Sequence, residues 1–201
     1  MTVRVRRRPG RPVGGQPVVD RNLLLDAAER VIRRDGAGAS LEAIAIEAGV
    51  SKPIVYARIG SRTELANALA QRLTDRLLAA PGLELSTRAY QRSTLAAFIK
   101  STLETIGEHR ELFLYVTRGA ADDTPERTLY FAERSALPLA TLLVRWRVRH
   151  DLDATLAVPW AYAIIGMLNL VSLWWINEPD RSADVLADQI AELLWSGLAD
   201  S

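Results

Sequence analysis

The sequence of 201 residues contains no cysteine and only two histidines, His109 and His150. Without cysteine, disulfide bonds and thiolate metal sites are excluded, and the chain is compatible with a reducing cytoplasm. With two histidines, a zinc site would have to be built mostly from carboxylates, which is unusual. We therefore expect neither a metal nor another cofactor.

The sequence also lacks the short motifs of common enzymes. It has no glycine-rich phosphate loop, no metal-ligand spacing and no nucleophile elbow. Glu108 and His109 are neighbours, but a solvated helix end explains this pair better than a catalytic base with its orienting carboxylate. We expect that the protein is not an enzyme.

No apolar run follows the basic N-terminus, so we expect no secretory signal. Residues 154–177 carry no charge and are numerous enough to cross a bilayer, which needs about 20 apolar residues. Pro159 and Asn169 interrupt this stretch, and acidic residues flank both ends without a bias toward Lys or Arg. We favour a helix buried between subunits over a membrane span, and we expect a cytoplasmic, nucleoid-associated protein with no membrane partner.

Charge is distributed unevenly along the chain. Residues 1–65 carry 12 Lys and Arg against 7 Asp and Glu, whereas residues 66–201 carry 13 against 17. A basic front and an acidic back indicate that only the front meets a polyanion, although a chance fluctuation of a few charges would look the same. Hydrophobic residues make up 49% of the chain, enough for a substantial core.

The first 19 residues combine arginines with prolines and glycines, a composition that cannot pack a core. We predict a flexible basic arm over residues 1–19, with a solubilising tail as the alternative. Arginine suits phosphates and narrow minor grooves because its flat guanidinium is weakly hydrated and donates as a fork. The arginines expected on DNA are Arg6, Arg7, Arg8 and Arg11.

The rest of the chain shows helical periodicity, with no convincing strand alternation and no internal repeat. The pattern predicts an all-α fold of about nine helices, with a three-helix helix-turn-helix domain at 20–65 and a ligand-binding and dimerisation domain at 66–201. In the first helix, one apolar stripe combines Leu23, Leu24, Ala27, Ala28, Val31 and Ile32. The expected helices are 20–36, 41–48, 52–58, 62–80, 88–106, 109–120, 125–149, 153–177 and 182–199.

Residues 41–60 have the pattern of a helix-turn-helix. Ala45 is small enough for two helices to pass closely, and Gly49 tolerates the positive φ that the turn requires. Ser40 and Ser51 are N-cap residues for the two helices. The apolar residues expected to lock the pair onto the preceding helix are Ile44, Ala48, Val50, Val55 and Ile59. An ordinary helical hairpin in a core is the alternative.

From Arg21 to Leu65 the chain resembles the tetracycline-repressor (TetR) family of bacterial regulators. The resemblance rests on Ala27-Ala28, Gly36, Ile44-Ala45, Ala48-Gly49-Val50-Ser51, Tyr56 and Ser61-Arg62-Thr63-Glu64-Leu65. It implies that Tyr56 lies in the recognition helix and that the segment from Ser61 opens the fourth helix against the DNA backbone. It covers about a third of the chain, and the remainder matches only in length and helical character.

The resemblance also implies residue roles on double-stranded DNA. Side chains expected to face the major groove are Lys52, Pro53, Ile54 and Tyr56, and those expected to approach phosphates are Ser40, Ser51, Tyr56, Arg58 and Arg62. Two positions depart from the family: Ile59 stands where an aromatic residue is usual, and Glu42 where a polar or basic DNA contact is common. The Glu42 carboxylate either accepts from a cytosine amino group or stays clear of the phosphates.

The C-terminal part is predicted to form a homodimer, with a purely intramolecular core as the alternative. Its apolar helix at 153–177 and the striped helix at 182–199 would make a four-helix interface with a second subunit, as the last two long helices do in the resembled family. The expected interface residues are Ala163, Gly166, Met167, Trp174, Trp175, Leu186, Ile190, Leu193 and Leu194.

Aromatic residues between the two ends favour a cavity for a small apolar or aromatic effector. The candidates are Phe98, Phe113, Tyr115, Tyr130, Phe131, Trp146, Trp160, Tyr162 and Met167, although each alone is more often plain core. Arg145, Arg147 and Arg149 with His150 could instead orient an acidic ligand, but a solvated helix face explains them more simply.

Together these features predict a ligand-responsive transcriptional regulator, most simply a repressor that the effector releases from a palindromic operator. Two recognition helices set about 34 Å apart by a two-fold dimer would read both half-sites. The alternative is a helical protein-interaction module without specific DNA binding. The sequence does not identify the operator, the effector or the regulated genes.

Overall fold

The computed structural model describes residues 20–79, 91–118, 125–178 and 180–199, with the side chains of 118, 125–131 and 197–199 outside the description. All regular secondary structure in these ranges is helical, which confirms the predicted fold class. The helices are α1 (Arg21–Asp35), η1 (Gly36–Gly38), α2 (Leu41–Glu47), α3 (Lys52–Arg58), α4 (Arg62–Leu78), α5 (Arg92–Glu108), α6 (Arg110–Arg118), α7 (Pro125–Arg149), η2 (Ala154–Leu156), α8 (Ala157–Trp175) and α9 (Ala183–Ala199). The basic arm, including Arg6, Arg7, Arg8 and Arg11, lies outside the described residues.

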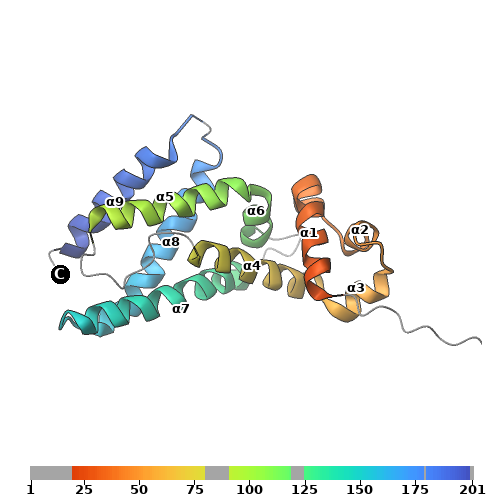
Figure 1. Cartoon of the computed structure of the whole chain (residues 1–201), viewed down its shortest axis with the longest axis horizontal. Helices are drawn as coiled ribbons and strands as arrows, with labels where there is room; N and C mark the ends of the chain where they lie inside the picture. The colour runs from red at the N-terminus through yellow and green to blue at the C-terminus, as the bar shows by residue number, and fades with distance from the viewer. Residues whose placement is uncertain (1–19, 80–90, 119–124, 179, 200–201) are drawn as a thin grey trace, which may run out of the picture.

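The molecule is elongated, with α1, α2 and α3 at one end and α5, α7, α8 and α9 at the other (Figure 1). Helix α4 runs from the first group into the second, and α6 lies where the two groups meet. In the larger group, α7 packs along α8 and α5 packs along α9. Two hydrophobic clusters, one at each end, form the core.

Helix α1 begins and ends where its sequence indicates. The Asp20 carboxylate accepts a hydrogen bond from the Asn22 backbone N–H at 3.0 Å, and Gly36 ends the helix with a φ of 57°. The predicted stripe is buried except at Leu23, which is 59% exposed, whereas Leu25 takes its place in the core. That one prediction was wrong because the buried face of α1 contains Leu24, Leu25 and Ala28, and at about 100° per residue Leu23 lies beyond the edge of that face.

Helix α4 belongs to both ends of the molecule. Its start is fixed by a capping box, in which the Ser61 hydroxyl accepts from the Glu64 N–H and the Glu64 carboxylate accepts from the Ser61 N–H. Leu65, Leu69 and Leu73 then pack in the cluster that holds the helix-turn-helix. The domain boundary expected at residue 65 therefore falls inside a continuous helix.

The corner between α7 and α8 is held by Arg147. Its guanidinium lies over the Trp160 ring, 4.3 Å from the ring centroid, and its Nε donates to the Asp153 carbonyl. Only 2% of the side chain is exposed. A solvated face was expected here, and Arg147 departs from it because the aliphatic stem and planar head fill the corner while the one carbonyl accepts.

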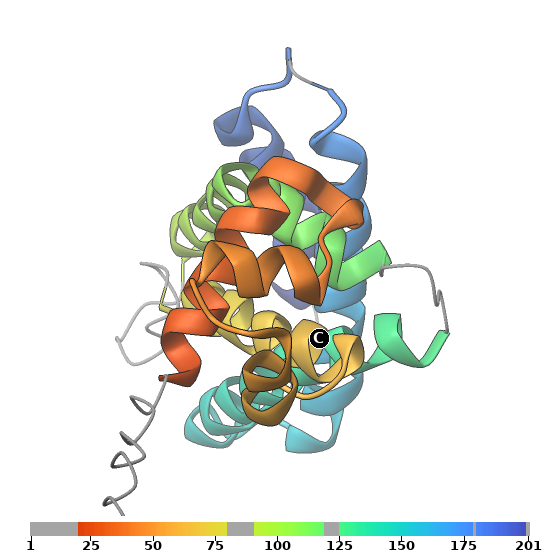
Figure 2. The ribbon, with the colours of Figure 1, turned by 90° about the vertical axis from the view of Figure 1, so that its right-hand side faces the viewer.

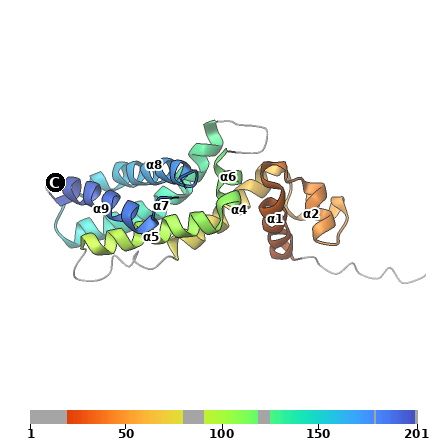
Figure 3. The same ribbon diagram turned by 90° about the horizontal axis from the view of Figure 1, so that it is seen from above.

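Among the described residues, one helical stretch, Ala154–Trp175, is long and apolar enough to cross a membrane. Only about a fifth of it is buried within the subunit. Figure 3 shows α8 running along the outside of the larger group of helices. One uncovered apolar helix is weak support for a membrane span, and such a surface is typical of a contact with another protein chain.

Candidate nucleic-acid interface and effector cavity

The turn between α2 and α3 depends on Gly49. Its φ is 66°, a left-handed conformation that costs a side chain–bearing residue energy. Around it, the Gly49 N–H donates to the Ile46 carbonyl at 3.1 Å and the Val50 N–H donates to the Ala45 carbonyl at 3.0 Å. These bonds end α2 and turn the chain into α3.

The apolar residues expected to anchor this unit do so. Ile44, Val55 and Ile59 are buried in one hydrophobic cluster with residues of α1, and Ala48 and Val50 pack against that cluster. Ile59 fills the position beneath α3 where the resembled family often has an aromatic residue, and it is almost fully buried. Gly60 follows with a φ of 95°, and a Cβ there would lie 2.0 Å from Glu64 Oε2. Glycine at this position therefore leaves room for the α4 capping box.

The outer face of α3 is uncovered. Seen from the end of the molecule, α1, α2 and α3 lie nearest the viewer with the remaining helices behind them (Figure 2). The predicted groove-facing residues Lys52, Pro53 and Tyr56 are exposed, Tyr56 by 50%, and Ile54 is half-buried. Arg58 is exposed in the last turn. Helix α3 thus offers a short, protruding and partly apolar surface with a basic residue at each end of the helix.

The two serine caps differ in their free hydrogen-bonding capacity. The Ser40 hydroxyl accepts from the Ala43 N–H at 3.1 Å, which leaves its own O–H to donate elsewhere. Ser51 caps α3 through its backbone carbonyl, which accepts from Ile54, and its exposed hydroxyl makes no capping bond. Both hydroxyls can donate to a phosphate.

Glu42 on α2 and Lys52 on α3 form an ion pair across the turn. The Lys52 Nζ lies 3.4 Å from the Glu42 Oε2, and both side chains are at least half exposed. An exposed pair of this kind contributes little to stability. Its consequence is electrostatic, because Glu42 offsets the charge of the one lysine in the recognition helix.

Arg62 points inward in this structure. Its guanidinium donates to the Ala39 carbonyl at 3.1 Å and to the Ala37 carbonyl at 3.4 Å. It therefore ties the start of α4 to the loop before α2. Sequence reasoning placed Arg62 near phosphates, whereas here it positions the helix-turn-helix against α4.

A group of ionic contacts joins α1 to α4, and we call it the α1–α4 clasp: Asn22, Asp26, Glu29, Arg72 and Arg76. Arg76 donates to both oxygens of Glu29, at 2.9 and 2.8 Å. Arg72 donates to Asp26 at 2.6 Å, to Glu29 at 3.3 Å and to Asn22. Glu29 is mostly buried beneath them. The clasp fixes the helix-turn-helix to α4 through two arginines one turn apart.

A small cleft lies beside the clasp, where α1 meets the junction of α5 and α6. Its lining residues are Glu29, Arg33, Glu108, His109, Arg110, Glu111 and Leu112. Burial lowers the pKa of His109, and the positive charges of Arg76 and Arg33 lower it further against the opposing effect of Glu29 and Glu108. The net effect favours the neutral form of His109, at the place where the two ends of the molecule meet.

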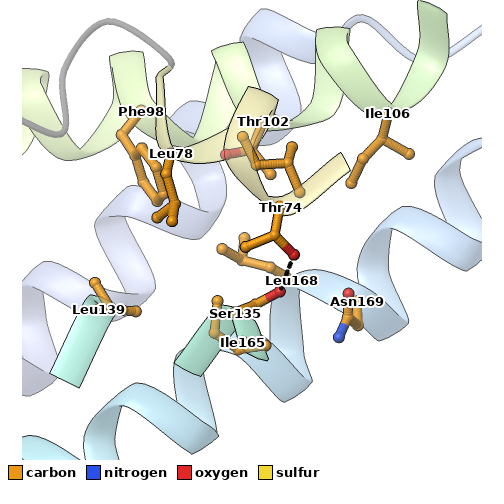
Figure 4. Close-up of a pocket in the computed structure, with 11 residues that line it drawn as sticks. Thr74, Leu78, Phe98, Thr102, Ile106, Ser135, Leu139, Ile165, Leu168 and Asn169 are labelled. Atoms are coloured by element: carbon orange, nitrogen blue, oxygen red, sulfur yellow. Dashed lines mark hydrogen bonds between the residues drawn. The ribbon is translucent and has the colours of Figure 1, made fainter. Parts of the chain in front are cut away.

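A second cavity lies among α4, α5, α7 and α8, and Figure 4 shows its wall. Its volume is about 30 Å³, and its lining residues are Thr74, Leu77, Leu78, Phe98, Thr102, Ile106, Ser135, Leu139, Ile165, Leu168 and Asn169. The wall is apolar apart from small neutral polar groups, and no ionisable side chain belongs to it. Such a wall suits an apolar molecule with few polar groups.

Helix α4 links this cavity to the clasp. Thr74 lines the cavity, while Arg72 and Arg76, two residues to either side, bind α1. A displacement of α4 at the cavity would therefore also move Arg72 and Arg76 relative to α1.

The outer side of α8 presents a row of uncovered residues. Ala163, Gly166, Leu170 and Trp174 are all exposed, and their spacing of three or four residues places them on one face of the helix. Leu170 is 70% exposed. Val185 and Leu193 are exposed on α9. We call these six residues the α8–α9 face.

Residues 24–69 match the family model described as bacterial regulatory proteins, tetR family, and residues 83–201 match the tetracyclin repressor-like C-terminal domain. The protein belongs to the TetR family. This family comprises helix-turn-helix transcriptional regulators that bind operator DNA, dimerise and bind small effectors, and the present protein is such a regulator.

Two relatives of this TetR-family regulator are mycobacterial. It is 34% identical over 206 aligned positions to the HTH-type transcriptional activator FasR of Mycolicibacterium smegmatis, covering 96% of this chain and 93% of that protein. It is 27% identical over 184 residues to an uncharacterized HTH-type transcriptional regulator of Mycobacterium tuberculosis, covering 89% of this chain and 76% of that one.

The fold is also similar to that of a solved TetR-family structure. The regulator FadR from Bacillus subtilis, solved in complex with stearoyl-CoA, superimposes with a TM-score of 0.65 at 19% identity, covering 89% of this chain and all of that chain. At this identity the likeness concerns the fold.

The aromatic residues expected in the effector pocket of this TetR-family regulator do not form one group. Of those whose side chains the structure describes, Phe98 alone lines the cavity. Phe113 and Tyr115 are buried in the N-terminal cluster. Trp146 lies against His150, with ring centroids 4.9 Å apart. Residues packed at the margin of the C-terminal cluster are Trp160, Tyr162 and Met167, while the side chains of Tyr130 and Phe131 lie outside the described residues.

The residues expected at the dimer interface are divided between the surface and the subunit's own core. Those exposed are Ala163, Gly166, Trp174 and Leu193, and those half-buried are Met167, Trp175 and Leu194. Leu186 and Ile190 are buried in the C-terminal cluster, where α9 packs on α5. Trp175 is anchored in its own subunit, because its Nε1 donates to the Arg181 carbonyl at 2.9 Å.

Sequence reasoning missed the polar part of the cavity of this regulator. Thr74, Thr102, Ser135 and Asn169 lie on helices whose apolar periodicity made them look like incidental interruptions. The one available signal was their position, since Thr74 and Thr102 fall on the buried faces of α4 and α5.

Proposed function

We propose that this regulator binds a palindromic operator as a homodimer, with Lys52, Pro53, Ile54 and Tyr56 of each α3 in the major groove. The observation that carries the proposal is the uncovered α3, held at one end of the molecule with its N-terminal residues outward. A helix of this length makes few base contacts, so phosphate contacts supply much of the affinity. The residues that we expect to supply them are Ser40, Ser51, Tyr56, Arg58 and Arg62. Arg62 also donates to the Ala37 and Ala39 carbonyls, so it joins α4 to the loop before α2 as well.

The arm arginines extend the same proposal. Arg6, Arg7, Arg8 and Arg11 precede α1 in the chain, so they are available to DNA beside the helix-turn-helix. Because arginines neutralise phosphates through their charge, we expect these four to add affinity and salt dependence more than sequence preference. The acidic remainder of the chain supports a DNA contact limited to this end.

The dimer forms through the α8–α9 face. This face is apolar, exposed and lies on the larger group of helices, away from α1, α2 and α3. Small residues at Ala163 and Gly166 allow helices to approach closely, and Leu170, Trp174 and Leu193 supply apolar area. Covering it would account for an uncharged α8 without a membrane.

The effector is a small apolar molecule that binds in the cavity between α4, α5, α7 and α8. The wall supports this class because it is apolar with neutral polar groups. The resemblance in fold to FadR in complex with stearoyl-CoA supports it as well. Effector pockets are commonly about 300–1,000 Å³, far larger than the cavity in this structure, so a bound effector must push its walls apart.

Widening the cavity provides the switch. Helix α4 forms one wall through Thr74, so separating the walls moves α4 and, through the clasp, the helix-turn-helix. Effector and operator then favour different states of the dimer, which typically gives about 1–3 kcal/mol of coupling. Effector binding would release the operator, and repression follows where the operator overlaps a promoter. The protein would act in the cytoplasm, on the nucleoid.

Selection of bound sequences from random duplex DNA tests the proposal. The expected result is a palindrome whose half-sites are one helical turn apart, bound with affinity that falls steeply with salt. Tyr56→Ala should abolish enrichment, while Leu23→Ala, an exposed change on α1, should leave it intact. Sequence-independent binding, or none, would instead favour an interaction module.

A further inference from the structure

The cavity wall carries three hydroxyl groups whose hydrogen-bonding capacity is not fully satisfied by the described part of the protein. The Thr102 Oγ1 is buried, with only 5% of the residue exposed, and has no hydrogen-bond partner among the described residues. A helical threonine usually satisfies its hydroxyl by bonding to the carbonyl one turn back, so an unpartnered one is notable. A buried hydroxyl without a partner is unfavourable, and a ligand atom can supply the missing bond.

The other two hydroxyls are only weakly paired. The Thr74 Oγ1 and the Ser135 Oγ lie 3.4 Å apart, well beyond the usual O–H···O separation of about 2.7–2.8 Å. Figure 4 shows these side chains pointing toward each other across the cavity, from α4 and α7. Each hydroxyl has one donor and two acceptor positions, so both retain capacity for a third partner between them. Asn169 lines the same cavity from α8 and adds an amide.

The wall contains no charge to match a charged ligand. None of its residues is Lys, Arg, His, Asp or Glu. Two cations adjoin wall residues in the sequence, Arg76 beside Leu77 and Arg134 beside Ser135. Arg76 donates to Glu29 and Arg134 donates to Gln71, and neither is part of the wall. Burying a carboxylate here would remove its water without providing a counter-charge, which is strongly unfavourable. A neutral oxygen loses far less and gains the hydroxyls.

We propose that the cavity selects an effector with an aliphatic body and one uncharged oxygen, such as an alcohol, ester or thioester, and rejects the corresponding free carboxylate. The oxygen lies at Thr102 and the Thr74–Ser135 pair. The aliphatic body lies against Leu77, Leu78 and Leu139. This inference rests on the proposed function, because it assigns the chemistry of the same effector site.

Four probes of matched chain length separate the possibilities: hexadecan-1-ol, methyl palmitate, palmitate and hexadecane. Each is titrated into the full-length protein below its solubility limit, and binding is followed by thermal stabilisation and tryptophan fluorescence. Methyl palmitate and the alcohol should bind at least about tenfold more tightly than hexadecane, since a site with unpaired hydroxyls discriminates against an analogue without an acceptor. Palmitate at pH 8 should bind more weakly than its ester.

Variants then locate the oxygen. Thr102→Val removes the hydroxyl at nearly constant shape and should weaken methyl palmitate binding about tenfold while leaving hexadecane unchanged. Ser135→Ala should act in the same direction and serves as a second variant should Thr102→Val misfold by circular dichroism. Thr117→Val is the matched control, a buried threonine outside the cavity, and should keep the wild-type preference.

The outcomes distinguish this inference from the proposed function. Equal binding of palmitate and its ester, or an unchanged ester-to-alkane preference in both cavity variants, would overturn the neutral-oxygen selection. Failure of all four probes, with a different class of compound releasing the operator, would also overturn it while the regulatory proposal stands. If no compound class releases operator DNA from the folded dimer, the effector-controlled function itself is wrong.

Discussion

The Lys52 ammonium lies 3.4 Å from the Glu42 carboxylate, so the recognition helix carries its lysine already paired with an acid from the preceding helix. Lysine is the residue that a phosphate or a guanine would attract, and the acid competes for it. We therefore expect the pair to temper DNA affinity, because Glu42 is directed to Lys52.

Replacing Glu42 tests this competition. Glu42→Gln should raise affinity for operator and non-specific duplexes by about threefold to tenfold at low salt, since it frees Lys52 and removes repulsion from phosphates. The difference should shrink at high salt. Fluorescence polarisation with labelled duplexes measures it, and Glu104→Gln on α5 is the control. Lower affinity for operator alone would show that Glu42 contacts a base.

Tyr56 and Lys52 should each be needed for operator binding. Tyr56→Ala and Lys52→Ala should each weaken operator affinity by at least about tenfold, because each removes a groove contact worth about 1–3 kcal/mol. Both side chains are at least half exposed, so thermal unfolding should hardly change. A polarisation titration decides the matter, and unchanged affinity in both variants would refute the assignment of α3.

The clasp should contribute to stability and to the orientation of the DNA-binding end. Glu29→Gln leaves the shape intact but removes the charge that two arginines share, so we expect a loss of about 1–3 kcal/mol in the free energy of unfolding. Urea unfolding measures the loss. Glu192→Gln, which affects an exposed pair with Arg92, provides the comparison and should change stability little. Equal effects of the two changes would argue against a special role for the clasp.

The free energy of unfolding should decrease as pH falls, because of His109 in the cleft beside the clasp. His109 has a pKa lowered from its ordinary value of 6.5, chiefly by burial. The unfolded chain therefore takes up a proton at a higher pH than the folded chain, and stability is lost as pH falls below about 6.5. His109→Gln should lose less stability than the wild type between pH 7.5 and 5.5 in urea titrations. A steeper loss in the variant would contradict the stated cause.

The dimer proposal makes a further prediction. Leu170→Glu places a charge in the middle of the α8–α9 face, where a partner subunit would have to bury it, and should yield monomers at micromolar concentration. Sedimentation velocity distinguishes monomer from dimer. Val148→Glu is a useful control, because it is also exposed but lies on α7. A wild-type protein that sediments as a monomer would refute the interface.

The helix-turn-helix was predictable because its determinants are local. Ser40, Gly49 and Ser51 fix helix ends through bonds spanning only a few residues, and these bonds are present. Once these helix ends are fixed, the side chains of Ile44, Val55 and Ile59 fall in the same hydrophobic cluster. The predicted stripe of α1 was wrong at Leu23 because periodicity alone does not show where the edge of the buried face lies, and the structure buries Leu25 instead.

The cavity was less predictable because it depends on how four distant segments meet. Large aromatic residues suggested a pocket, yet Phe113 and Tyr115 fill the junction between α6 and the DNA-binding end. Small hydroxyl residues such as Thr102 line the actual space, and their role appears only when α5 lies beside α4 and α7. The prediction that Arg147 lies on a solvated helix face was wrong for a related reason. Its burial depends on how α7 and α8 meet at Trp160, which the sequence pattern does not show.

The exposed Leu170 and Trp174 side chains on α8 have a consequence for how the protein assembles in the cell. A newly made subunit with that surface in water is prone to stick to other chains, so pairing must follow synthesis closely. Occupancy of a binding site that requires two subunits rises with roughly the square of their number at low abundance. If α8 and α9 form the dimer interface, a truncated copy that keeps them but lacks α3 would inhibit the intact protein in a dominant-negative manner, because it would form heterodimers with a single recognition helix.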